Sequence, residues 1–175
     1  AVMENKNKSG ADNNVYLPDS KTITIGESGL TGSIPEKLFA GINGAPATAM
    51  FLNTFYRCDK LTGEIPANLF AGVKGAPADT MFKYTFGECW SLDGKIPDGL
   101  FAGISGAAAP NMYAYTFVGV PLVGELPLGF LGDLSGEPVR GMFFATFHHV
   151  YNLTGLSARN PDGTPLYEVF PNATT

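Results

Sequence analysis

Apolar residues recur in the same order about every 31 positions from Leu30 onward. Five columns keep an apolar residue in four successive copies: Leu30, Leu61, Leu92 and Leu122; Ile34, Ile65, Ile96 and Leu126; Phe39, Phe70, Phe101 and Leu131; Met50, Met81, Met112 and Met142; and Phe55, Phe86, Phe117 and Phe147. Other columns vary between polar, charged and small residues, as at Ser33, Glu64, Lys95 and Glu125. Because polar groups are seldom buried without partners, we expect the constant columns to face the interior and the variable columns to face water.

These copies define the organisation of the chain. Four units occupy residues 30–60, 61–91, 92–121 and 122–152, and a partial unit occupies 153–175; the first two match at 18 of 31 positions. The third unit is one residue shorter, with the deletion just before Leu122. Residues 1–29 begin with a polar, asparagine-rich stretch, and residues 22–25 alternate like a strand. We therefore expect a mobile N-terminal segment followed by a capping strand.

Each unit contains signals for more than one kind of element. Residues 61–65 alternate in a way that suits a short strand. Pro66 then lies where a first helical residue belongs and Gly72 closes the turn, which indicates a short helical turn before a corner at 75–77. The stretch 81–89 is ambiguous, because its apolar residues fall at helical spacing while their types favour strand. We favour a short strand near 80–82 followed by a helical turn, with a longer helix as the alternative.

An isolated unit is too small to offset the entropy lost when its backbone is ordered. Neighbouring units must therefore supply both strand pairing and core contacts. Corresponding residues then pile into shared columns inside one elongated core. The sharpest form of this prediction is that Phe55, Phe86 and Phe117 are direct neighbours.

The repeat signature resembles that of a known family. The pattern TF-x-x-C-x-x-L-T-G-x-I-P-x-x-L-F is carried by Thr54, Phe55, Cys58, Leu61, Thr62, Gly63, Ile65, Pro66, Leu69 and Phe70, and again from 85 to 101. It is similar to the BspA-like leucine-rich-repeat-type surface proteins of bacteria, over roughly residues 22–157. The resemblance implies an α/β fold, a right-handed leucine-rich-repeat-like solenoid with short strands and short helical turns and about 31 residues per coil. It also implies a secreted or cell-surface bacterial module that serves adhesion, and it transfers no catalytic residue.

Composition narrows the classes of partner. Charged residues make up 15% of the chain and the net charge is -5, so no basic field is present to hold a nucleic acid backbone. No apolar run approaches the roughly 18 to 20 residues of a membrane-spanning helix, so we expect no span in this segment. The chain begins at Ala1 without a hydrophobic leader, which fits a mature secreted protein or a trimmed fragment.

The cysteines and histidines give weak signals for chemistry. Cys58 and Cys89 occupy one column, and valine replaces them in the next two units. Because side chains in one column point in parallel, we expect buried thiols rather than a disulfide, and a metal site is the least favoured. His148 and His149 are the only histidines. Successive residues point in different directions, which predicts a solvated turn and no chelate.

Aromatic residues in variable columns are the best candidates for binding. They are Tyr56, Tyr84, Trp90, Tyr115 and Tyr151. Exposed tyrosine and tryptophan are enriched where proteins or sugars dock, and the alternative is that these rings pack over neighbouring coils. Glu64 and Lys95 belong to a second variable column and complete the candidate binding set. This column also contains Glu125, and glycosidases use paired carboxylates. Lys95 lies between the two glutamates, however, which favours a solvated surface over a catalytic pair.

Together these features predict a non-enzymatic extracellular or cell-surface module that binds a protein or a glycan and needs no cofactor. The second interpretation is a structural spacer or a subunit that associates end to end through open edges. An enzyme is the third, because no cysteine or serine lies in a recognisable nucleophile setting.

Overall fold

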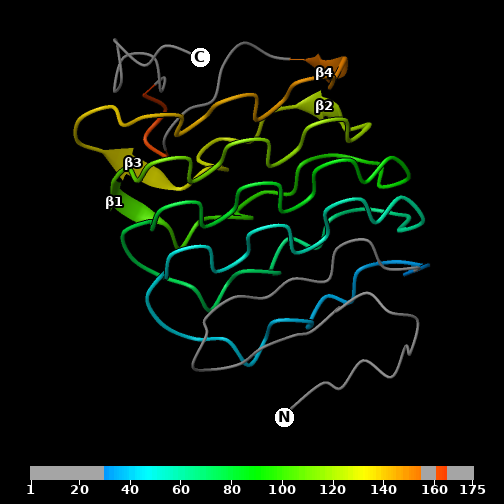
Figure 1. The fold of residues 1–175 in the computed structure, drawn as a ribbon, viewed down its shortest axis with the longest axis horizontal. Coiled ribbons are helices and arrows are strands. Elements are labelled where there is room, and N and C mark those ends of the chain that lie inside the picture. The colour runs from blue at the N-terminus through cyan, green and yellow to red at the C-terminus, as the bar shows by residue number, and fades with distance from the viewer. Residues whose placement is uncertain (1–29, 155–160, 165–175) are drawn as a thin grey trace.

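The computed structural model describes residues 30–154 and 161–164, and its regular elements there are four strands of three residues each. They are β1 (Ser105–Ala107), β2 (Val123–Glu125), β3 (Asp133–Ser135) and β4 (Asn152–Thr154). β1 pairs with β3 and β2 pairs with β4, both in parallel (Figure 1). Isolated parallel bridges lie at corresponding places in the earlier repeats: Gly32 with Leu61, Gly44 with Val73, Gly63 with Leu92, and Gly75 with Ile104.

The expected α/β leucine-rich-repeat-like solenoid is wrong. The described residues contain no helix, and their strands form two separate two-stranded sheets. β2 lies between Pro121 and Pro127, and because proline has no N–H group with which to extend a ladder, these residues limit the length of this strand. The fold is a small, mostly strand arrangement joined by turns.

The expected helical turn at 66–72 is a pair of tight turns. Leu69 donates its N–H to the carbonyl of Pro66, and Ala71 donates to that of Asn68, both at 3.2 Å. The intervening Phe70 makes no such bond within this stretch. Bonds at every second residue close separate turns and do not build a helix, in which every residue donates.

The ambiguous stretch of each repeat is neither a strand nor a helix. It is a run of overlapping turns at 47–58, 78–89, 109–120 and 139–150, which we call the turn ribbon. Every second N–H group donates to the carbonyl three residues earlier, as from Met50 to Ala47 and from Leu52 to Ala49. In the first three repeats the other N–H groups donate to the next repeat, as from Phe51 to Met81 at 2.8 Å. Each repeat is thus bonded to the next through its backbone.

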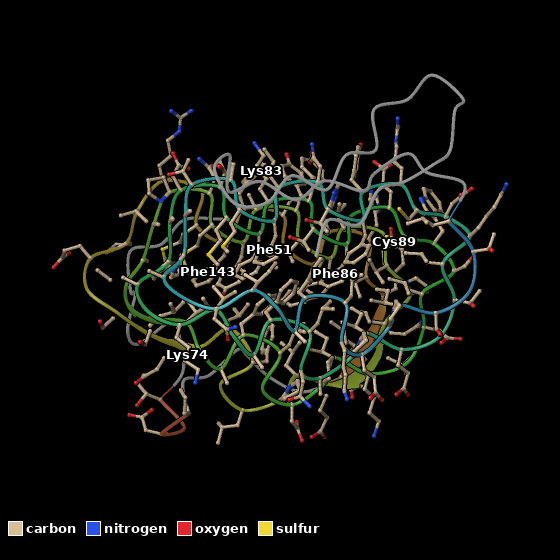
Figure 2. All side chains as sticks on the ribbon, turned by 90° about the horizontal axis from the view of Figure 1, so that it is seen from below. Phe51, Lys74, Lys83, Phe86, Cys89 and Phe143 are labelled. Carbon is tan, nitrogen blue, oxygen red and sulfur yellow. The ribbon has the colours of Figure 1, made fainter. Side chains whose placement is uncertain are left out.

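Every fourth residue of the turn ribbon has a positive φ. In the second repeat these residues are Thr80, Tyr84 and Glu88, with φ of 54°, 56° and 58°. The resulting backbone turns two consecutive side chains inward and the next two outward. Thr85 and Phe86 are therefore buried, whereas Lys83 and Tyr84 reach the surface. Figure 2 shows Phe86 inside the cross-section and Lys83 at its outer edge.

The predicted column of phenylalanines is confirmed. Ring centroids of Phe55 and Phe86 are 5.5 Å apart, those of Phe86 and Phe117 are 5.6 Å apart, and those of Phe117 and Phe147 are 5.5 Å apart. A second column joins Phe51, Phe82 and Tyr113 at 5.5 and 5.4 Å. The repeats thus lie one above another along a shared core (Figure 1). The expected capping strand at 22–25 and most of the partial unit 153–175 lie outside the described residues.

Candidate functional site

The outward side chains of the turn ribbon bring aromatic residues from four consecutive repeats together. They are Tyr56, Tyr84, Tyr115 and Phe144, which we call the aromatic row. Ring centroids of Tyr56 and Tyr84 are 4.9 Å apart, those of Tyr84 and Tyr115 are 4.5 Å apart, and those of Tyr115 and Phe144 are 5.2 Å apart. The three tyrosines are half-buried and Phe144 is 45% exposed. The row is a continuous strip of aromatic surface along the direction in which the repeats stack.

Tyr84 and Tyr115 are stacked face to face. Their rings are only 2° from parallel, so each ring covers one face of the other. Burial raises the pKa of Tyr84, and the neighbouring Tyr115, Tyr56 and Glu88, together with a hydrogen bond to Tyr115, raise it further. The Tyr84 hydroxyl therefore stays neutral at ordinary pH. The row offers ring edges and hydroxyl groups to a partner, and few free ring faces.

A charged cluster lies at the first-repeat end of the aromatic row. Arg57 Nε donates to Glu88 Oε2 at 2.9 Å, and the Tyr56 hydroxyl donates to Glu88 Oε1 at 3.2 Å. The guanidinium carbon of Arg57 lies 5.3 Å from the centroid of the Tyr56 ring. The Arg57 side chain is 54% exposed, so it reaches solvent despite these contacts. This end of the row presents an arginine beside an aromatic ring.

The structure joins three of the predicted binding residues, Tyr56, Tyr84 and Tyr115, and separates the others. Trp90 lies just past the end of its turn ribbon, is 65% exposed, and makes no ring contact with another described residue. Tyr151 occupies the corresponding place in the fourth repeat and is 80% exposed. The alternative that these rings pack over neighbouring repeats therefore holds for the aromatic row, and it fails for Trp90 and Tyr151.

Glu64 and Lys95 lie on another part of the repeat. A Cβ added at Gly94 would come within 2.5 Å of Glu64 Cγ, and one added at Gly124 would come within 3.3 Å of Lys95 Cγ. Each side chain thus extends over the glycine of the following repeat. Among the described residues neither side chain forms a hydrogen bond, ion pair or ring contact with the aromatic row, so the predicted site divides into separate parts.

Sequence reasoning missed Arg57, Glu88 and Phe144. Outward pairs of side chains recur every four residues along the turn ribbon. This spacing places Arg57, Glu88 and Phe144 on the same surface as the three tyrosines. Sequence reasoning also missed a buried threonine column in the interior: Thr54, Thr85, Thr116 and Thr146. The Thr85 hydroxyl lies 2.7 Å from the carbonyl oxygen of Phe82 and 3.0 Å from that of Phe51 in the preceding repeat.

Cys58 and Cys89 are buried and form no disulfide, as predicted. Cys89 Sγ lies 2.9 Å from the carbonyl oxygen of Phe55. Burial, reinforced by Cys58 beside it, raises the pKa of the Cys89 thiol and makes it a poor nucleophile. The part of the chain that the structure describes holds no group of three or more histidine, cysteine or acidic residues suited to a metal ion.

The prediction for the histidines is wrong in one respect. His148 and His149 form one outward pair of the turn ribbon, and their ring centroids are only 3.9 Å apart. Both side chains are exposed, as expected, but they point the same way. The reason is the positive φ of 61° at His149, which a helix or a strand does not have.

No protein-family model, curated protein or solved structure matches the chain. Within residues 30–154 and 161–164, no helix is long and apolar enough to cross a membrane.

Proposed function

We propose that this chain is a non-enzymatic extracellular or cell-surface module that binds a protein partner through the aromatic row. The observation that carries the proposal is the contact of Tyr56, Tyr84, Tyr115 and Phe144 across four repeats. Tyrosine and arginine are the residues most often found at the energetic centre of protein interfaces. The similarity of the repeat signature to BspA-like surface proteins supports the same location and role.

The stacking geometry favours a protein over a glycan. A sugar ring usually packs flat on an exposed aromatic face, and the paired faces of Tyr84 and Tyr115 cover each other. The hydroxyls and ring edges of these half-buried tyrosines suit main-chain and side-chain groups of a polypeptide. Arg57, held by Glu88 and Tyr56, adds an ordered cation that fits a carboxylate on the partner.

The test compares binding to arrays of extracellular proteins and of glycans. The double variant Y84N/Y115N removes the two stacked rings, and Asn53 already occupies this column in the first repeat, so the backbone tolerates asparagine there. We expect protein binding to fall at least about tenfold, the typical effect of losing an interface hot spot. Lys74 lies on the opposite side of the cross-section from Lys83, so K74N is the matched control and keeps full binding (Figure 2).

Two results would contradict the proposal. One is protein binding that is unchanged in Y84N/Y115N. The other is binding to glycans and to no protein, with the same strength in Y84N/Y115N and in K74N.

A specific observation also favours self-association as a second function. In the third repeat, Tyr115, Phe117 and Gly119 donate N–H groups to the fourth repeat. The corresponding N–H groups of Ala145, Phe147 and His149 have no acceptor among the described residues. Main-chain donors at the edge of a stack of repeats invite pairing with another chain. Light scattering over a concentration series tests for self-association. A molar mass that remains that of a monomer at every concentration would exclude it.

A further inference from the structure

The outward pair His148 and His149 places two imidazole rings side by side on the surface. Their centroids are 3.9 Å apart and their planes differ by 36°. Both side chains are exposed, so small rotations can aim one nitrogen of each ring at a common point without disturbing the core. These are also the only two histidines of the chain, so any property that depends on imidazole must come from this pair.

Tyr151 orients one of the two rings. Its hydroxyl is hydrogen-bonded to Nδ1 of His149, which leaves Nε2 of that ring facing away from the tyrosine. A hydroxyl both donates and accepts hydrogen bonds. If Nε2 gives up its proton to bind a metal ion, Nδ1 carries the ring proton and donates it to Tyr151. This is the arrangement of metal-binding histidines, whose second nitrogen usually donates to an oxygen.

We propose that His148 and His149 bind a divalent transition-metal ion, with Tyr151 as the residue that positions His149. Imidazole is a favoured ligand of copper, nickel and zinc, so these are the ions that the site would take. Two protein ligands leave further positions for water or for a ligand from a partner. The affinity should follow the usual order for nitrogen ligands, with copper bound most tightly.

The turn ribbon, and not the local sequence, brings the two rings together. The corresponding pair in the first repeat is Tyr56 and Arg57, whose side chains also point outward and lie in contact. The same backbone therefore presents paired side chains at both places. A pair of histidines placed at 56 and 57 should reproduce the arrangement.

The experiment is calorimetric titration of the untagged chain with copper, nickel or zinc chloride. The variant C58V/C89V serves as the background, because valine fills that column in the third and fourth repeats and leaves no thiol to bind metal. We expect one ion per chain. Replacing the histidines with the first-repeat pair, as H148Y/H149R, should abolish binding, and Y151F should weaken it about tenfold.

The second part of the experiment builds a new metal site in the first repeat. Y56H/R57H should raise the stoichiometry from one ion to two. Affinity that persists in H148Y/H149R, or an unmodified chain that binds no ion at about 1 mM, overturns the proposal. A stoichiometry that stays at one in Y56H/R57H overturns the claim that ribbon geometry builds the site.

Discussion

The sequence Leu-Phe-Ala-Gly recurs at 38–41, 69–72 and 100–103, and in the last two copies its glycine lies against the backbone of the preceding repeat. A Cβ added at Gly72 would lie 1.9 Å from the carbonyl oxygen of Ile42, and one added at Gly103 would lie 2.1 Å from that of Val73. No side chain fits at such a distance. These glycines therefore set how closely two repeats approach, in addition to closing a turn.

The substitution Gly103→Ala should destabilise the protein by about 1 to 3 kcal/mol, the usual cost of overpacking. Gly41 occupies the same column in the first repeat, and a Cβ added there meets no atom of the described residues within 4 Å, so Gly41→Ala is the matched control. Urea denaturation followed by circular dichroism measures both. Equal effects at the two positions would show that close approach is not what requires glycine at 103.

The buried thiol of Cys89 should make stability depend on alkaline pH. Its pKa is raised in the folded state, so the folded protein keeps a proton that the unfolded chain releases above about pH 8.5. The stabilisation is complete below that pH and is lost as pH rises, by up to about 1.4 kcal/mol per unit.

Denaturation at pH 8 and pH 10, compared between the natural chain and Cys89→Val, isolates this effect. Val120 and Val150 hold the same column in later repeats, so valine fits there. The natural chain should lose more stability than the variant. Parallel losses in the two proteins would assign the pH dependence to other groups.

The turn ribbon is built on conformations that most residues avoid. Ala49, Asn53 and Arg57 all have φ between 55° and 59°, which costs a residue with a side chain about 1 to 2 kcal/mol. The backbone hydrogen bonds offset this cost. All five N–H groups that do not close a turn within residues 49–57 donate to the second repeat, at 2.8 to 3.0 Å.

Relief of this strain predicts opposite effects for two nearby substitutions. Ala49→Gly should raise the free energy of unfolding by about 0.5 to 1 kcal/mol, because glycine adopts positive φ without penalty. Ala47, whose φ is not positive, is equally half-buried, and Ala47→Gly should lower the free energy by a similar amount. Thermal and urea unfolding measure both. A loss of stability at both positions would contradict the argument.

From the sequence, the buried residues of the turn ribbon can be predicted more reliably than the type of secondary structure that they form. Met81, Phe82, Thr85 and Phe86 recur as two inward pairs at a spacing of four, which lies close to the 3.6 of a helix, while their types suit strands. Neither pattern reveals positive φ, because residues as different as Thr80 and Glu88 adopt it. The tyrosines of the site were predictable as variable aromatics. Arg57 and Glu88 were not, because their pairing depends on that backbone.

Across the whole molecule, stability depends on columns of rings that continue from one repeat to the next. Phe86 contacts Phe55 on one side and Phe117 on the other, and it is fully buried. Phe147 is the last member of this column among the described residues and is only half-buried. Interior and terminal members of a column therefore differ in how much they contribute.

Phe86→Ala should lower the free energy of unfolding by about 3 to 5 kcal/mol, and Phe147→Ala by roughly half as much, since fewer contacts are lost. Chemical denaturation of the two variants provides the comparison. Equal losses would mean that the fourth repeat is packed as tightly as the second.

The bonds between neighbouring turn ribbons run from main chain to main chain, and this has a consequence for how such a protein evolves. When the DNA that encodes one 31-residue repeat is duplicated or lost, the main-chain N–H groups of each repeat still meet the same carbonyl groups of the next repeat. Outward residues then diverge without disturbing that pairing. Recombination can therefore lengthen or shorten the molecule and rearrange its outward side chains, with no new architecture required.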